Sequence, residues 1–174
     1  MVRTQDAVAS ARALLGTPYE EMDCIALIRA VIRRSAGGEK GYRCEGTNWL
    51  WRSTQNSGKY RHLTWRQESM QGARAGMLAF KRNGEDIHHV GLVTQEGTVI
   101  HSSSVSGCVM ETTLDGSWHC LGQHRCIEVS GQEINKDVQP SDADTAYERI
   151  TIVDAMGNRF EPVGDFRVLR GSCD

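Results

Sequence analysis

The chain has 174 residues, a formal net charge of −2 at pH 7 and 39% hydrophobic residues, which suits one compact domain with one core. A near-neutral balance offers no basic surface for nucleic acid or an anionic membrane, so neither is expected as a partner. No apolar run is long enough to span a bilayer. The first residues lack the apolar segment of a secretory signal. We therefore expect synthesis in the cytoplasm, with the six cysteines as reduced thiols.

Two helices are predicted near the N-terminus. Apolar residues recur at helical spacing over residues 6–15, and Thr4 is a suitable cap. A second amphipathic helix begins at Cys24, with Asp23 as its N-cap and the glycine pair 37–38 as its stop.

Residues 39–75 predict one or two short helices within loops. From residue 77 onward the apolar period changes to that of strands, and turn signals separate five short runs. These predicted strands cover residues 77–81, 88–94, 98–102, 108–113 and 124–129. Helices followed by an antiparallel meander predict an α+β fold.

The end of the chain differs in composition from the rest. Residues 130–145 are polar and predict a linker between a main domain of residues 1–129 and a tail of residues 146–174. The turn signal Gly157-Asn158 predicts a β-hairpin in that tail. A segment this short cannot build its own core. We expect it to pack on the main domain, a neighbouring subunit or a larger assembly partner.

Cys24 is the first candidate for chemistry. Free N–H groups and the positive end of the helix dipole favour a thiolate in a first helical turn. A single cysteine is more often a small buried hydrophobe, and a single histidine is more often structural. His89 and His101, however, follow on predicted strands. The order Cys, His, His on these elements indicates a cysteine hydrolase.

Strand alternation distinguishes His89 from its neighbour His88. It places His89 on the face opposite Val90 and Leu92 and sends His88 the other way, so His89 is the expected base and His88 the alternative. A second alternative is a zinc site, although its spacing matches no common structural zinc pattern, and no metal or cofactor is expected. Its residues would be Cys108, His119, Cys120, His124 and Cys126. The histidines at 62, 119 and 124 are expected on the surface or in structural hydrogen bonds.

Several segments resemble the NlpC-type cell-wall cysteine peptidases. They are residues 16–19 (Gly-Thr-Pro-Tyr), Asp23-Cys24 with Leu27, and the runs 75–80, 89–93 and 99–103. The resemblance extends over residues 5–129. It implies a papain-like fold, in which the helix carrying the nucleophile packs on an antiparallel sheet.

The resemblance also implies roles for residues. Cys24 becomes the nucleophile, His89 the base and His101 the group that orients His89. Tyr19 and Asp23 are assigned to substrate binding. The implied substrate is the peptidoglycan stem peptide, cut at a D-γ-glutamyl–diamino acid bond. A phage particle or a lysis machine is one expected route by which such an enzyme reaches the wall.

The chain departs from the family around the nucleophile. Only residues 20–22 separate Pro-Tyr from Asp-Cys, and Ile25-Ala26 replaces the usual Ser-Gly after the cysteine. These changes indicate an altered substrate groove. Two other functions therefore stay open, a thiol amidase or acyltransferase of the same fold acting on a non-wall substrate, and a non-catalytic structural module of a phage or secretion assembly.

Overall fold

The computed structural model describes residues 1–134, 152–153 and 159–160. The chain divides into two compact units, residues 1–137 and 138–174. In the second unit, β7 (Ile152–Val153) pairs antiparallel with β8 (Arg159–Phe160). The other residues of the predicted tail, and residues 135–145 of the predicted linker, lie outside the described part of the chain.

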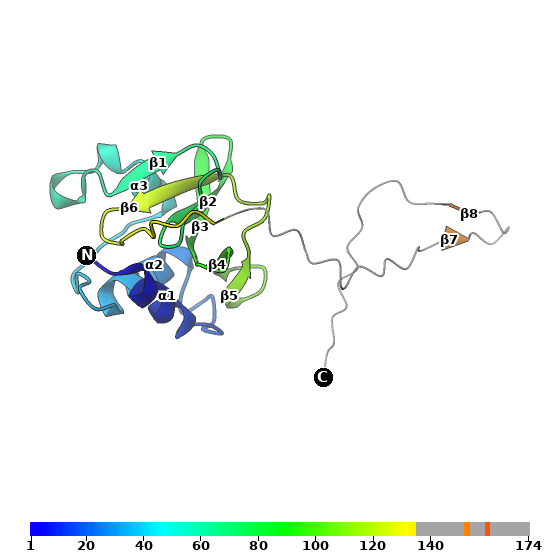
Figure 1. Ribbon diagram of the computed structural model, residues 1–174, viewed down its shortest axis with the longest axis horizontal. Coiled ribbons are helices and arrows are strands. Elements are labelled where there is room, and N and C mark those ends of the chain that lie inside the picture. The colour runs from blue at the N-terminus through cyan, green and yellow to red at the C-terminus, as the bar shows by residue number, and fades with distance from the viewer. Residues whose placement is uncertain (135–151, 154–158, 161–174) are drawn as a thin grey trace. The chain divides into compact units, whose positions relative to one another are not determined.

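The first unit combines helices with one antiparallel sheet, whose strands are not in sequence order (Figure 1). Its helices are α1 (Thr4–Arg12), α2 (Cys24–Arg34) and α3 (Thr47–Trp51), followed by 3-10 turns at Ser53–Gln55 and Gly58–Tyr60. Its strands are β1 (Thr64–Gln67), β2 (Leu78–Asn83), β3 (Asp86–Val93), β4 (Thr98–Ser103), β5 (Cys108–Thr113) and β6 (Cys120–His124). Within the described residues, no helix is both long and apolar enough to cross a membrane.

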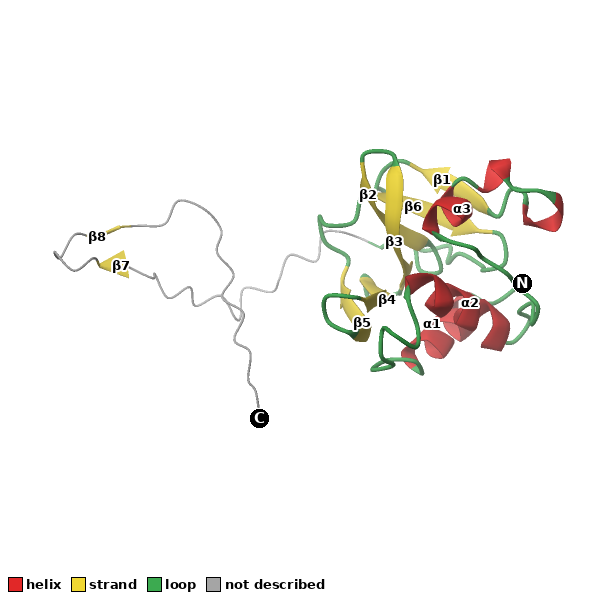
Figure 2. Ribbon diagram, turned by 180° about the vertical axis from the view of Figure 1, so that it is seen from behind, coloured by secondary structure: helices red, strands yellow, loops and turns green. Residues whose placement is uncertain are grey.

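The sheet has the strand order β1-β6-β2-β3-β4-β5. Strands β2 to β5 form the predicted meander, and β6 returns to the other side of β2, where it pairs with β2 and β1. Helices α1 and α2 lie side by side against β3 and β4 (Figure 2). The α+β prediction is therefore confirmed.

Three details of the prediction are wrong. Strand β1 was not predicted, and the last strand was predicted at residues 124–129, whereas β6 ends at His124. Thr4 was predicted as a cap, but it lies inside α1 and its hydroxyl donates to the Glu128 carbonyl at 2.7 Å. This contact joins α1 to the segment after β6, a long-range partner that local sequence cannot reveal.

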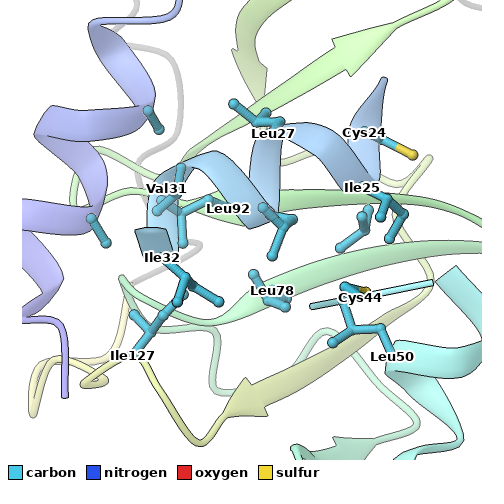
Figure 3. Packing of buried hydrophobic residues seen from close by; sticks show 14 of the residues in the cluster. Cys24, Ile25, Leu27, Val31, Ile32, Cys44, Leu50, Leu78, Leu92 and Ile127 are labelled. Carbon is cyan, nitrogen blue, oxygen red and sulfur yellow. The ribbon is translucent and has the colours of Figure 1, made fainter. Parts of the chain in front are cut away.

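Helix α2 begins at Cys24 as predicted. Asp23 is its N-cap, and the Asp23 carboxylate accepts a hydrogen bond from the Ala26 amide at 2.6 Å. The helix ends at Arg34 with Ser35 as C-cap, before the predicted glycine stop. Its apolar side, including Leu27 and Val31, packs in the main core, and Cys24 lies at the N-terminal end of the helix (Figure 3).

The two faces of the sheet carry separate apolar clusters. The larger cluster joins α1, α2 and α3 to the sheet face that bears Val90 and Leu92. The smaller cluster lies on the opposite face and includes Val93, Val99 and Trp118. Two neighbouring strands, β3 and β4, therefore contribute to both cores, and the candidate histidines lie on these strands.

Candidate active site

The Cys24 thiol lies where α2 meets β3. Its residue is only 7% exposed. Backbone amides of Val90, Ile25 and Cys24 itself interact with the sulfur and lower the pKa of the thiol. Because Val90 directly follows His89 on β3, this contact places the nucleophile candidate beside the strand that carries the base candidate.

A β-bulge at His88 sets the direction of His89. In the β2–β3 ladder Lys81 pairs with His89, whereas Arg82 pairs with Ile87, so His88 is the additional residue. The bulge lets both Ile87 and Val90 face the main core while His89 points to the opposite face. His88 is exposed. The sequence-based choice of His89 over His88 agrees with this geometry, although the bulge itself was not predicted.

The hydrogen-bonded ladder between β3 and β4 is short. It pairs Leu92 with Ile100 and Val93 with Val99. Farther along β4, the Ser102 hydroxyl donates to the carbonyl of Met22, in the loop that leads into α2. This hydrogen bond joins the strand that carries His101 to the loop that precedes Cys24.

The two histidines form a hydrogen-bonded relay that ends on a threonine. His89 Nε2 lies 2.8 Å from His101 Nδ1, and His101 Nε2 lies 3.2 Å from Thr112 Oγ1. A neutral imidazole carries one donor and one acceptor, so we assign N–H to Nε2 in both rings, with donation toward Thr112. His89 Nδ1 then carries a lone pair for the thiol. Thr112 was missed because only the fold places β5 against His101.

Trp118 and Lys81 complete the surroundings of the relay, and both were also missed. The indole of Trp118 is stacked on His89 at 5.6 Å between ring centroids and meets His101 edge-on at 5.3 Å. The Lys81 ammonium lies 4.7 Å from the Trp118 ring centroid. Trp118 is 3% exposed, so it shields the histidines from water. No sequence periodicity links these two residues, because they come from β2 and from the turn before β6.

Burial keeps both histidines neutral. Desolvation lowers the pKa of His89 to about 4, assisted by the charges of His101, Lys81 and His88. Desolvation and then Lys81 lower the pKa of His101 to about 4. Near neutral pH both imidazoles are therefore uncharged in the resting site, and His89 is ready to accept a proton.

The expectation of a preformed thiolate at Cys24 is wrong for the resting site. Desolvation is the largest influence on the thiol and raises the pKa of Cys24, and the Asp23 carboxylate raises it further. The three backbone amides oppose this shift but do not outweigh it. Burial therefore favours the neutral thiol at Cys24 before a substrate binds.

The structure brings Tyr19 near the nucleophile and uses Asp23 at the helix end. Burial raises the pKa of the Tyr19 hydroxyl, followed by the charges of Cys24 and Asp23, so the phenol is within electrostatic range of both. The Tyr19 amide donates to the Gly107 carbonyl at 2.8 Å, which ties this loop to the β4–β5 turn. Asp23 is exposed and caps α2. A role of either residue in substrate binding stays a prediction.

The residues of the alternative zinc site do not gather. Among the described residues, no group of three or more His, Cys, Asp or Glu side chains is placed to hold a metal ion. His124 is fully buried, its Nδ1 accepts from the Cys126 amide at 3.1 Å, and its Nε2 lies 2.9 Å from the Tyr42 hydroxyl. His119 is exposed and accepts from the Arg82 amide. These are the structural roles that the sequence predicted.

Gly91 is required between the two histidine strands. A Cβ at this position would lie 2.4 Å from Val99 Cγ1 and 3.0 Å from His101 Cβ. We expect Gly91→Ala to push β4 away, to weaken the His89–His101 bond and to lower the free energy of unfolding by about 1–3 kcal/mol. Gly41→Ala is the control, since a Cβ at Gly41 meets nothing within 4 Å. Denaturant unfolding compares the two variants, and equal stability would contradict the account of this close approach.

The lowered histidine pKa values predict activity that persists in acid. A depressed pKa keeps the neutral, competent imidazole down to lower pH, so the acid limb of kcat/KM should lie well below pH 6. The raised pKa of Cys24 should move the alkaline limb to higher pH than for an ordinary thiol. The lowered pKa of His89 also makes the free energy of unfolding depend on pH. The stabilisation is complete above about pH 6.5 and is lost as the pH falls toward 4, because the unfolded chain then binds the proton more readily than the folded one. A kcat/KM profile with an acid limb near pH 6.5 would contradict this prediction.

Comparisons with known proteins agree with this geometry. The family model "NlpC/P60 family" matches residues 13–127, which is more than half of the chain. No curated protein sequence matches the chain. The chain is also similar to solved structures, three of which are described next.

The structure of the peptidoglycan hydrolase RipB from Mycobacterium tuberculosis has a TM-score of 0.52 at 17% identity, over 72% of this chain and 65% of that chain. The P60 domain of an antigen from M. avium subspecies paratuberculosis has a TM-score of 0.50 at 15% identity, over 69% of this chain and 93% of that chain. The NlpC/p60 domain of the peptidoglycan hydrolase SagA has a TM-score of 0.47 at 21% identity, over 69% of this chain and 97% of that chain.

The family match extends from the end of α1 through β6 and includes every element of the candidate site. The two structural likenesses at or above a TM-score of 0.50 support the papain-like fold. The chain belongs to the NlpC/P60 family and is a cysteine peptidase of the papain-like fold that acts on peptidoglycan.

Proposed function

We propose that the chain hydrolyses the D-γ-glutamyl–diamino acid bond of peptidoglycan stem peptides, with Cys24 as nucleophile, His89 as base and His101 as the residue that orients His89. The single observation that carries the proposal is the hydrogen bond between His89 Nε2 and His101 Nδ1 at 2.8 Å. His89 lies on β3, and the amide of the next residue, Val90, contacts the Cys24 thiol. The family supplies the peptidoglycan substrate.

The chemistry follows from the proton positions. Cys24 Sγ attacks the amide carbon while His89 Nδ1 takes the thiol proton, and a C–S bond forms as the carbonyl oxygen becomes an oxyanion. His89 then delivers that proton to the leaving nitrogen, so the C–N bond breaks and the free amine departs. Water, deprotonated by His89, hydrolyses the thioester and restores the Cys24 thiol. Each cycle consumes one water and changes no oxidation state.

His101 acts through His89 in this scheme. When His89 becomes an imidazolium, its Nε2–H donates to His101 Nδ1, and His101 passes the polarisation to Thr112. The neutral third residue fixes the ring but supplies no full negative charge. The stacked Trp118 prevents the His89 ring from turning away.

The start of α2 supplies the stabilisation of negative charge. The backbone amide of Cys24 lies in the first turn of α2, where amides have no partner inside the helix and the helix dipole is positive. It interacts with the Cys24 sulfur in the resting site. We take it as the candidate donor to the oxyanion once the sulfur has bonded to the substrate.

Purified stem peptides of defined sequence test the proposal. Wild-type protein should cut the γ-glutamyl bond and release a new amine on the diamino acid. Mass spectrometry should then detect two products, one from each side of that bond. Cys24→Ala protein is the control and should release none. If wild-type protein cuts no stem peptide although Cys24 is readily alkylated, the thiol chemistry stands and the substrate is a different amide, as in an amidase or acyltransferase of this fold.

A further inference from the structure

Lys81 lies beside the catalytic relay without serving it. It is the direct cross-strand partner of His89, so both side chains leave the same face of the sheet. Its ammonium is held over the Trp118 ring that also stacks on His89. The side chain is half-buried. The lysine ammonium thus lies over the same aromatic ring that packs on His89.

Within the described residues, no carboxylate forms an ion pair with Lys81. The ion pairs there use the arginines 3, 12, 52 and 82 and Lys59. The Trp118 ring gives the ammonium only the partial compensation of a cation–π contact. An anionic group of a substrate would therefore supply the counter-charge that the described residues do not.

This unmatched charge also opposes the proposed chemistry. Lys81 lowers the pKa of both His89 and His101, so it disfavours the imidazolium that forms when His89 takes the thiol proton. An anion placed against Lys81 would cancel that repulsion at the moment of attack. The arrangement therefore favours substrates that bring their own negative charge to this position.

We propose that Lys81 binds a substrate carboxylate next to the scissile amide and makes this carboxylate a condition for fast turnover. The inference rests on the proposed function, because the stem peptide offers two such groups. One is the free α-carboxylate of the γ-linked glutamyl residue on the acyl side, and the other is a free carboxylate of the diamino acid on the leaving side. Amidation of the recognised carboxylate removes its charge and should convert a good substrate into a poor one.

Two variants of Lys81, one neutral and one that keeps the positive charge, separate this role from a structural one. Lys81→Met keeps the length and apolar stem but removes the charge, and Lys81→Arg keeps the charge. Lys40→Met is the matched control, since it removes one exposed positive charge beyond the C-terminal end of α2. Steady-state kinetics then compare three stem peptides, with both carboxylates free, with the glutamyl α-carboxylate amidated, and with the diamino acid carboxylate amidated.

Wild-type protein and the Lys40→Met control should lose about 10- to 100-fold in kcat/KM when the recognised carboxylate is amidated. In Lys81→Met that ratio should shrink to within about 2-fold, chiefly because KM for the free carboxylate rises, and Lys81→Arg should restore most of it. The amidated peptide on which the wild-type protein loses kcat/KM identifies whether Lys81 binds the glutamyl carboxylate or the diamino acid carboxylate.

Alkylation of Cys24 gives a second reading that needs no peptide substrate. Iodoacetate carries a carboxylate and iodoacetamide is its neutral analogue, so the ratio of their rates at Cys24 should fall about 5- to 10-fold in Lys81→Met. A fall of either ratio supports the proposal, and two unchanged ratios overturn it. Failure of the proposed function looks different, because the wild type would then cut no stem peptide while the alkylation ratio still responds to Lys81.

Discussion

Replacing Cys24 with alanine is expected to lower amide hydrolysis by about 10⁴-fold or more, because it removes the proposed nucleophile. The fold should persist, since the change removes only one sulfur atom from the core cluster. Turnover of a stem peptide, followed by release of the amine, measures the loss. Thermal unfolding confirms that the variant is folded.

Cys44→Ala is the matched control for this variant. Cys44 is also buried, and desolvation raises the pKa of its thiol to about 11, but its sulfur donates to the Gly46 carbonyl rather than facing a histidine. Its loss should leave kcat within about 3-fold of the wild type. Equal loss of activity in both variants would mean that packing of the core, and not a nucleophile at Cys24, explains the first result.

His89→Ala is expected to lower kcat by about 10³-fold, since it removes the proton acceptor. His101→Ala should cost less, about 10- to 100-fold, because His89 keeps its place against Trp118 but loses the acceptor at Nε2. Single-turnover kinetics with excess enzyme separate this effect from weakened binding. Neither change empties a large apolar volume, so stability should change little.

His88→Ala provides the comparison within the same strand. His88 is the exposed residue of the bulge, and its neighbour His89 holds the relay. The variant should keep most of the wild-type kcat. If His88→Ala abolished activity while His89→Ala did not, the register of β3 in this account would be wrong by one residue.

Local patterns were sufficient for the elements that carry Cys24 and the histidines. The start of α2 depends on an Asp N-cap and on apolar spacing, both of which are local, and β5 was predicted with the bounds that the structure has. Alternation around Val90 and Leu92 also placed His89 on the correct face. The nucleophile candidate and the base candidate were therefore within reach of sequence reasoning.

The rest depends on contacts between distant segments. Strand β1 exists because it completes the sheet beside β6, and its exposed Trp65 and Arg66 give it no amphipathic alternation. Trp118, Lys81 and Thr112 reach the relay from three different elements, and none has a motif of its own. The sequence predicted a lowered pKa for Cys24, and this direction is wrong. A helix start can be recognised in the sequence, whereas the burial that raises the pKa of the thiol cannot.

The central claim is that Cys24, served by the His89–His101 relay, forms a covalent acyl-enzyme with a γ-glutamyl substrate. Rapid acid quench of the protein with a defined stem peptide, followed by peptide mapping by mass spectrometry, tests it most directly. The account predicts a transient mass increase equal to the acyl part of the substrate on the peptide that contains Cys24, and its accumulation should slow in His89→Ala. An acyl group on another residue, or release of the amine with no adduct on Cys24 at any time point, would contradict it.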